Sequence, residues 1–533
     1  MNMIRNPILK GFNPDPSIVR VGEDYYIATS TFEWFPGIQI HHSKDLVHWR
    51  LVHQILREKR LLDMTGNPDS GGVWAPCLSY HEGTYYLIYT DAKSLTGAFK
   101  DTPNYLTTAP AIEGPWSDPV YLNSSGFDPS LFHDEDGRKW LLNMVWDHRK
   151  GRNPFYGIQL QEYDAVNKKL IGDKHIIFRG TELGCTEGPH LYKKDGWYYL
   201  MTAEGGTGYE HAVTMARSRS ITGPYEVDPQ NPILTAYDAE DAVLKKAGHA
   251  SLVETESGEW YIAHLCARPL LSSMKAPLGR ETALQRCYWK DGWLRVEHGP
   301  VPSVEVAEPA IDKSLPAVVD EPVRDEFDGQ ELGLHYATLR EPADPSWLSL
   351  TERPGYLRLY GRESLNSRHH QSLVARRIQH FELEAGTCVQ FEPEHFQQMA
   401  GLICYYNTKN YYYLRLSRDE EHGLGLNVLI NDQGVYDELL DSDMWIEEGT
   451  CYHLRVKIHA GSVQFFASTD GEQWFEVGGK LPLDLLSDEH ATRMAGGYFT
   501  DWGFTGAFVG VCVQDLSGER KYADFDYFEY QGR

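Results

Sequence analysis

The 533-residue sequence has few cysteines, no cluster of basic residues and no long apolar run. Its eight cysteines are scattered without a CxxC pair, which predicts reduced, structural thiols. A formal net charge of −26 would repel phosphate backbones and anionic lipids, so neither nucleic acid nor membrane is an expected partner. The opening residues lack the apolar segment of a signal peptide, and the sequence therefore predicts a soluble cytoplasmic protein.

Helical periodicity is also nearly missing, because no long apolar stripe at i, i+3, i+4, i+7 precedes residue 300. Aromatic residues are plentiful instead: 32 Tyr, 20 Phe and 14 Trp make up 12% of the chain. Such a composition is typical of β-strands and of surfaces that stack on sugars. The length exceeds what one hydrophobic core usually supports, so we expect an all-β protein of two domains.

One supersecondary unit recurs five times in the first half of the chain. Each copy holds a short apolar run, a turn such as Asp195-Gly196, and an aromatic and β-branched run, which is typical of a β-hairpin. Recurring turns at 112–116 and 221–225 predict further strands in each unit, and five four-stranded units predict a five-bladed β-propeller. The copies start, in steps of 60, 53, 60 and 61 residues, at Asp15, Ala75, Asp128, Gly188 and His249.

These patterns divide the chain into three parts. Residues 1–300 form the predicted propeller, and the Pro-bearing acidic stretch 301–324 is the predicted linker. Residues 325–533 are again strand-rich and predict an antiparallel, concanavalin-like β-sandwich that contributes to one side of the active site.

The starts of the five units carry the candidate chemistry. Equivalent positions in a propeller face one central channel, so Asp15, Asp128, His249 and Glu187, which directly precedes the fourth start, are expected at one mouth. A single Asp-Pro can simply open a turn, but three carboxylates at one mouth are not explained by packing. Inverting glycoside hydrolysis needs one carboxylic acid and one carboxylate, and a third carboxylate nearby raises the pKa of the acid.

Eight strings of the chain form a recognisable set: GFNPDPSI at 11–18, STFEWFPG at 30–37, GGVWAP at 71–76, SGFDPSLFHD at 125–134, TEGPHLY at 186–192, AEGGT at 203–207, LGRETALQ at 278–285 and FTGAFVG at 504–510. They resemble family 43 of the glycoside hydrolases, and more narrowly bacterial intracellular β-xylosidases with a C-terminal sandwich. The likeness covers essentially the whole chain. The segment 266–280 departs from it, because relatives carry a longer loop before the Gly-Arg-Glu-Thr string, which leaves the shape of the sugar pocket and the contacts between subunits open.

The resemblance implies a role for each candidate. Asp15 would be the general base, Glu187 the general acid, and Asp128 the residue that raises the pKa of the acid and orients it. In some relatives the histidine matching His249 ligates or approaches a calcium ion in the channel, and otherwise no cofactor is expected. Phe508 would close one side of the pocket, with Phe504 as the competing candidate. The other substrate-binding candidates are Phe32, Trp74, Ala75, Phe127, Trp146, Thr207, His249 and Arg280.

The function implied is inverting, exo-acting release of D-xylose from the non-reducing ends of β-1,4-xylo-oligosaccharides, by a homo-oligomer such as a dimer or tetramer. Three alternatives stay open. An α-L-arabinofuranosidase or a dual enzyme would use the same machinery on another sugar. A retaining hydrolase would use one carboxylate as a nucleophile, and a non-catalytic propeller would only bind carbohydrate.

Overall fold

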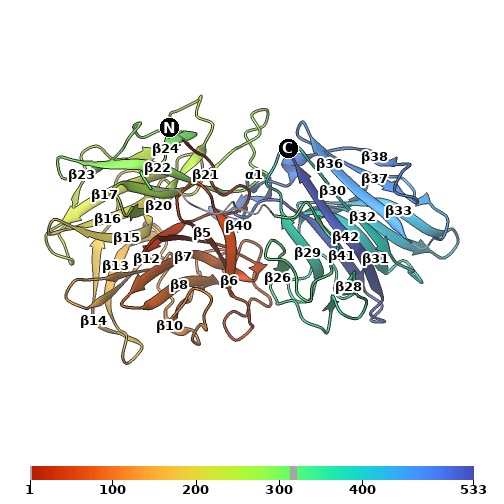
Figure 1. The fold of residues 1–533 in the computed structure, drawn as a ribbon, viewed down its shortest axis with the longest axis horizontal. Helices are drawn as coiled ribbons and strands as arrows, with labels where there is room; N and C mark the ends of the chain where they lie inside the picture. The colour runs from red at the N-terminus through yellow and green to blue at the C-terminus, as the bar shows by residue number, and fades with distance from the viewer. Residues whose placement is uncertain (1–2, 312–320, 450) are drawn as a thin grey trace.

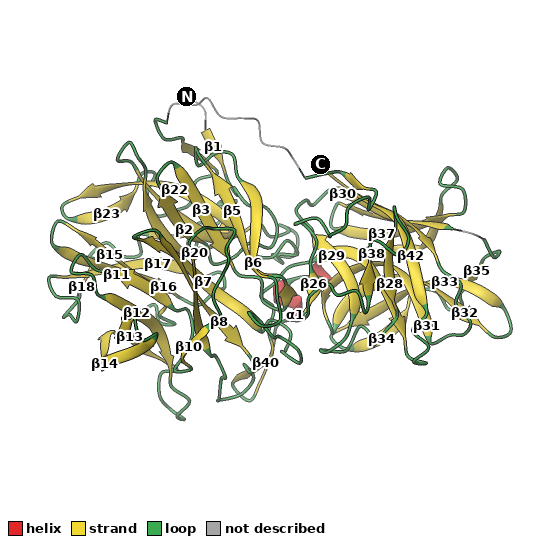
Figure 2. Cartoon of the chain, turned by 60° about the horizontal axis from the view of Figure 1, so that its bottom comes forward, coloured by secondary structure: helices red, strands yellow, loops and turns green. Residues whose placement is uncertain are grey.

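The computed structural model describes residues 3–311, 321–449 and 451–533, which form two β-rich bodies side by side (Figure 1). Helix is confined, in these ranges, to η1 (Leu483–Leu485) and α1 (Asp488–Ala491). Figure 2 shows the helical turn α1 between the two bodies. No helix of the described residues has the length and apolar character needed to cross a membrane.

The first body is a five-bladed propeller, as the repeat predicts, and each blade is an antiparallel sheet whose strands follow chain order. In the fourth blade, an additional strand, β19 (Leu234–Thr235), pairs with β17. The blades are β2 (Ser17–Val21), β3 (Asp24–Thr29), β5 (Gly37–Ser43) and β6 (Arg50–Leu56); β7 (Gly72–His81), β8 (Thr84–Ala92), β9 (Asn104–Ala109) and β10 (Val120–Asn123); β11 (Ser130–His133), β12 (Lys139–Trp146), β13 (Phe155–Asp164) and β14 (Lys169–Phe178); β15 (Glu187–Lys194), β16 (Trp197–Glu204), β17 (Ala212–Ser218) and β18 (Glu226–Val227); β20 (Lys245–Glu254), β21 (Trp260–Ala267), β22 (Glu281–Lys290) and β23 (Trp293–Val296).

The five predicted unit starts share a backbone conformation that most side chains avoid. The φ angles there are all positive: 54° at Asp15, 34° at Ala75, 55° at Asp128, 56° at Gly188 and 44° at His249. Only the fourth start is glycine, so four of the five pay the steric cost of the left-handed region. The repeat therefore includes a sharp bend at the start of each blade.

Serines two residues after some of these bends join neighbouring blades. The Ser251 hydroxyl accepts from the Ile18 amide at 2.9 Å and donates to the Pro16 carbonyl at 2.9 Å, which connects the last blade to the first. The Ser17 hydroxyl accepts from the Leu78 amide at 3.0 Å. The serine of the Asp-Pro-Ser motif is thus a blade-to-blade contact, which leaves the aspartate free for chemistry.

The second body is a sandwich of two antiparallel sheets around an apolar core. Two short strands, β39 (Arg493–Ala495) and β40 (Tyr498–Asp501), form a separate hairpin. One sheet comprises β25 (Arg324–Asp325), β27 (Leu348–Ser349), β28 (Leu357–Tyr360), β42 (Tyr522–Gly532), β30 (Leu383–Gln390), β36 (Tyr452–His459), β37 (Ser462–Ser468) and β38 (Phe475–Pro482), and the other β29 (Ser372–Arg377), β41 (Phe508–Asp515), β31 (Gln398–Asn407), β32 (Asn410–Asp419), β33 (Gly423–Asp432), β34 (Val435–Glu438) and β35 (Met444–Trp445).

The two bodies are joined by paired strands and a common apolar core. Strand β4 (Trp34–Phe35) of the propeller pairs with β26 (Thr338–Leu339), and one apolar cluster contains buried residues of both bodies. At the N-terminus, β1 (Met3–Arg5) pairs with β24 (Glu305–Ala307). The predicted linker, 301–324, falls partly on residues 312–320, which lie outside the described residues.

Candidate active site

A cavity of about 800 Å³ opens where the blade starts converge. All three predicted carboxylates line this cavity, together with His249 and Arg280. The sandwich supplies part of the wall as well, so the cavity belongs to both bodies rather than to the propeller alone.

Asp15 is buried and held as a carboxylate by cationic and hydroxyl partners. Its Oδ2 accepts from the Ser30 hydroxyl at 2.7 Å, and its Oδ1 lies 3.1 Å from Arg280 Nη1 and 3.9 Å from His249 Nδ1. Burial alone would raise the pKa of Asp15, but Arg280, His249 and the Ser30 hydroxyl together hold that pKa below its usual range. Asp15 is therefore a charged acceptor at neutral pH.

The pKa values of Asp128 and Glu187 are shifted in the opposite direction from that of Asp15. Burial, followed by the charges of Asp128 and Asp15, raises the pKa of Glu187 well above its usual range. Burial also raises the pKa of Asp128 to about 6, while His249 and a hydrogen bond of 3.0 Å from the Gly188 amide to its Oδ2 oppose the rise. At neutral pH Glu187 keeps its proton and Asp128 is mostly ionised, so the three carboxyl groups divide into one acid and two carboxylates.

Arg280 connects the carboxylate group to the other body. Its Nη1 donates to Asp15 and, at 2.9 Å, to the Thr207 hydroxyl, while Nη2 donates to the Phe504 carbonyl at 3.2 Å. The guanidinium lies beside two neighbouring aromatic rings, 5.2 Å from the centroid of Phe32 and 5.3 Å from that of Phe504. These contacts fix a buried cation, whose Nε has no partner among the described residues, at the cavity.

Aromatic rings form a continuous wall of the cavity. Trp74 lies 6.0 Å from Phe32, 5.4 Å from Phe127 and 6.1 Å from Phe504, measured between ring centroids. Trp146 continues the wall beside Phe127 at 6.4 Å. Because pyranose rings present apolar C–H faces, such a wall suits a sugar ligand, and four of these five rings were predicted as substrate-binding residues.

Two predicted pocket residues lie elsewhere. Phe508 is fully buried and stacks on Trp34 at 3.7 Å between the two bodies, so it cannot touch a sugar. The competing candidate Phe504 lines the cavity instead. Ala75 does not line the cavity either: its amide donates to the Ser30 hydroxyl at 2.7 Å, and Ser30 in turn donates to Asp15. Both residues contact residues around the pocket and not its interior: Phe508 packs on Trp34, and Ala75 holds Ser30 in place.

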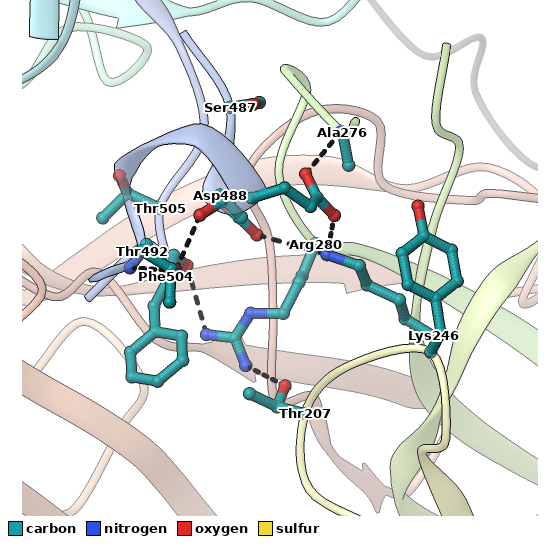
Figure 3. A network of polar contacts seen from close by, with 12 residues as sticks. Thr207, Lys246, Ala276, Arg280, Ser487, Asp488, Thr492, Phe504 and Thr505 are labelled. Atoms are coloured by element: carbon teal, nitrogen blue, oxygen red, sulfur yellow. Dashed lines mark hydrogen bonds and ion pairs between the residues drawn. The ribbon is translucent and has the colours of Figure 1, made fainter. Parts of the chain in front are cut away.

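A polar network from the sandwich closes one side of the cavity (Figure 3). Lys246 of β20 lies 2.5 Å from Glu489 Oε1 and 3.9 Å from Asp488 Oδ2, both on α1. Glu489 also accepts from the Ala276 amide at 2.7 Å, and Asp488 accepts from the Tyr406 hydroxyl at 2.7 Å. The buried lysine thereby fastens α1 to the last blade beside Arg280.

The segment 266–280, which departs from the resemblance, belongs to this junction. Lys275 lies 3.6 Å from Asp484, and the Met274 carbonyl accepts from the Tyr209 hydroxyl at 2.6 Å. Leu270 packs against the sandwich core. The short segment therefore shapes the contact between propeller and sandwich at the cavity rim.

His249 lies against the Asp15 and Asp128 carboxylates, with His190 and His211 as further neighbours. Calcium prefers six to eight oxygen ligands, and this neighbourhood offers imidazoles and two carboxylates that already have other partners. Within the described ranges His249 belongs to no group of three possible ligands that converge on one point. The calcium neighbour and the absence of other cofactors both stay predictions.

Sequence reasoning did not find the charged residues where the propeller meets the sandwich. Lys246, Asp488 and Glu489 line the cavity, and Lys100 and Trp502 add a further edge, where the ammonium lies 4.9 Å from the Trp502 ring centroid. Lys246 had one available signal, because it lies three residues before the fifth blade start. The residues of α1 had none, since they lie outside the repeat.

Two family models match the chain. One, described as glycosyl hydrolases family 43, covers residues 4–294, and the other, described as beta xylosidase C-terminal concanavalin A-like domain, covers residues 324–531.

Similar proteins span the same length. The chain is 51% identical to a protein named beta-xylosidase from Bacillus subtilis (strain 168), over 99% of each chain. It is 50% identical to xylosidase/arabinosidase 43B of Humicola insolens, over 100% of this chain and 98% of the relative. A crystal structure of xylan beta-1,4-xylosidase from Bacillus halodurans C-125 is 56% identical and superposes with a TM-score of 0.96, covering 99% of this chain and 100% of the other.

Proposed function

The chain belongs to glycosyl hydrolase family 43, and from this premise we propose that it is an inverting β-xylosidase that releases D-xylose from the non-reducing ends of β-1,4-xylo-oligosaccharides. One observation carries the proposal: three carboxyl groups in one aromatic-walled cavity whose pKa values are driven apart. Relatives named for xylosidase activity support the choice of sugar.

In this proposal Asp15 is the general base. Its pKa lies below the usual range, so it is ionised at neutral pH and can take a proton from a water that attacks the anomeric carbon. Arg280 and Ser30 fix the orientation of the carboxylate, and Arg280 and Thr207 also offer donors to sugar hydroxyls. The attack occurs on the face opposite the leaving group, which inverts the configuration.

Glu187 is the general acid, because its raised pKa keeps the proton that the leaving glycosidic oxygen needs. Asp128 modulates Glu187, because burial raises the pKa of Glu187 and the nearby negative charge of Asp128 raises it further. After each cleavage Asp15 returns its gained proton to solvent water and Glu187 takes one proton from solvent, which restores both groups for the next turnover. Asp128 itself exchanges no proton with the substrate.

The position of the sandwich supports action at a chain end. Phe504 and the α1 residues Asp488 and Glu489 form one side of the cavity, where a longer polysaccharide would have to continue. A closed side admits a terminal sugar and leaves the rest of the substrate outside. We therefore propose exo action.

The test compares 4-nitrophenyl β-D-xylopyranoside with 4-nitrophenyl α-L-arabinofuranoside and follows the products of xylohexaose labelled at its reducing end. We expect a higher kcat/KM for the xyloside, and unlabelled xylose with labelled xylopentaose as the first products. A higher kcat/KM for the arabinoside would overturn the choice of sugar. First products of intermediate length, or labelled xylose, would overturn exo action at the non-reducing end.

A second candidate is dual xylosidase and arabinofuranosidase activity, which the name of the Humicola insolens relative favours. It requires the same carboxylates and differs only in how the sugar ring fits the wall of Phe32, Trp74 and Phe127. Comparable kcat/KM values for both aryl glycosides would establish it.

We also propose a cytoplasmic homo-oligomer, a dimer or tetramer, as the family resemblance implies. Light scattering coupled to size-exclusion chromatography decides the oligomeric state, and a mass of 60.8 kDa would indicate a monomer. Cell fractionation decides the location.

A further inference from the structure

A second group of chemically reactive side chains lies on the sandwich, on the strand pair β30 and β36. Cys388 pairs directly with His453 in the antiparallel register, and Cys451 precedes His453 by two residues. Their neighbours Val389, Tyr452 and Leu454 belong to the sandwich core. Because side chains alternate along a strand, Cys388 and His453 point to the opposite, outer face of the sheet.

The ligand atoms of these three residues converge. One atom from each of Cys388, Cys451 and His453 lies within 4.8 Å of the other two, and no other such group of His, Cys, Asp or Glu occurs among the residues that the structure describes. Cys388 is buried, whereas Cys451 and His453 are half-buried, so the group has a dry side and a side open to solvent. An ion can therefore enter without unfolding the sheet.

The register argues against a disulfide between the two thiols. Cys388 is directly opposite His453, so Cys451 lies on the diagonal, where Cα atoms are typically ~7–8 Å apart. A disulfide usually requires a Cα separation of about 4.4–6.8 Å. Both cysteines are free thiols in the structure. The pair is thus better placed to share a metal ion than to form a bond.

We propose that Cys388, Cys451 and His453 bind one zinc ion. Two thiolates and an imidazole suit a soft or borderline tetrahedral cation, whereas calcium and magnesium require oxygen ligands. The fourth position is open to water or to Asp526, since a β-bulge places Asp526 and Tyr527 of β42 both opposite Cys388. The Tyr527 hydroxyl lies 3.2 Å from His453 Nδ1 and orients the imidazole.

The zinc site is structural rather than catalytic for glycoside cleavage. None of its three ligands lines the active-site cavity. Bound metal would connect β30 to β36 on the outer face, opposite the core residues Val389 of β30 and Tyr452 of β36. Since zinc would bind the folded sheet and not the dispersed ligands of the unfolded chain, it stabilises the sandwich.

The test uses the full chain, reduced and stripped of metal, then titrated with Co²⁺ as a spectroscopic substitute and with Zn²⁺ in competition. We expect one Co²⁺ per chain, a thiolate-to-cobalt charge-transfer band in the near ultraviolet, intense visible bands of tetrahedral cobalt, and displacement by one equivalent of Zn²⁺. Stoichiometric Zn²⁺ should raise the unfolding temperature by at least about 2 °C and leave xyloside hydrolysis unchanged.

Variants locate the site. Cys388→Ser with Cys451→Ser should abolish the charge-transfer band and the thermal shift, and His453→Gln should weaken zinc binding at least about tenfold. Cys185→Ser, which removes a half-buried thiol outside the group, should leave the cobalt spectrum unchanged. The proposal is overturned if the native chain gives no charge-transfer band with Co²⁺, or if the double variant retains the same spectrum.

Discussion

The propeller and the sandwich contribute to the same cavity in different ways. The propeller supplies Asp15 and Asp128 from equivalent bends of a repeated unit and Glu187 from the position directly before the bend at Gly188. The sandwich supplies Phe504 and α1 from segments that belong to no repeat. A repeated unit places equivalent residues at equivalent positions of successive blades. The positions of the catalytic candidates therefore follow from the repeat, whereas the closed side of the pocket depends on one contact between the two bodies.

The largest effect should come from substituting, one at a time, the two carboxyl groups of the propeller that exchange protons. Glu187→Gln should lower kcat on xylobiose by about 10²–10⁴-fold and affect an aryl xyloside with a good leaving group far less, because that leaving group needs little protonation. Asp15→Asn should lower both by similar factors, since water must be activated in each case. Steady-state kinetics on the two substrates measures the difference, and equal losses for Glu187→Gln would contradict its role as the acid.

A pair of phenylalanines tests the contribution of the sandwich. Phe508→Ala should destabilise the chain by about 3–5 kcal/mol, because the buried ring stacks on Trp34 between the bodies. Phe504→Ala should instead raise KM for the xyloside with a small change in unfolding temperature, because its ring faces the cavity. Calorimetry and kinetics on both variants separate the effects. A larger thermal loss for Phe504→Ala would reverse our assignment of the two rings.

Asp128 should set the alkaline limb of the pH profile. Above about pH 6 Asp128 is ionised, and its charge adds to burial in raising the pKa of Glu187, so the acid keeps its proton as the pH rises. Asp128→Asn removes the like charge, lowers the pKa of Glu187 and moves the alkaline limb to lower pH. The kcat/KM profile measures this. Asp195→Asn, at an exposed turn, is the control, and an unmoved alkaline limb in Asp128→Asn would contradict modulation.

The smallest effect is expected at the Lys246–Glu489 contact between the bodies. Glu489→Gln keeps an acceptor for the Ala276 amide but removes the charge beside a buried ammonium, which should cost about 1–3 kcal/mol and raise KM modestly. Glu23→Gln, in an exposed ion pair with Lys44, should change neither quantity. Identical behaviour of the two variants would show that α1 does not depend on this contact.

Sequence was sufficient where the fold repeats. The spacing of the five hairpins located all five bends and brought the three carboxyl groups to one cavity. Arg280 and the propeller aromatics, which only the family resemblance implied, line the same cavity. It was insufficient where two unrelated surfaces meet. Phe504 and Phe508 are four residues apart in one apolar string, and only the stacking of Phe508 on Trp34 decides which ring faces sugar. The thiols of Cys388 and Cys451 likewise gave no signal, because their convergence depends on the register of β30 and β36.

The central claim is that Asp15 activates water while Glu187 protonates the leaving group, with no covalent intermediate. Proton NMR of the first sugar released from a β-linked xyloside tests it most directly, because mutarotation is slower than a short enzymatic time course. The account predicts α-xylose as the first product, relaxing later to the equilibrium mixture. Initial release of β-xylose would show retention and contradict the division of roles among the three carboxyl groups.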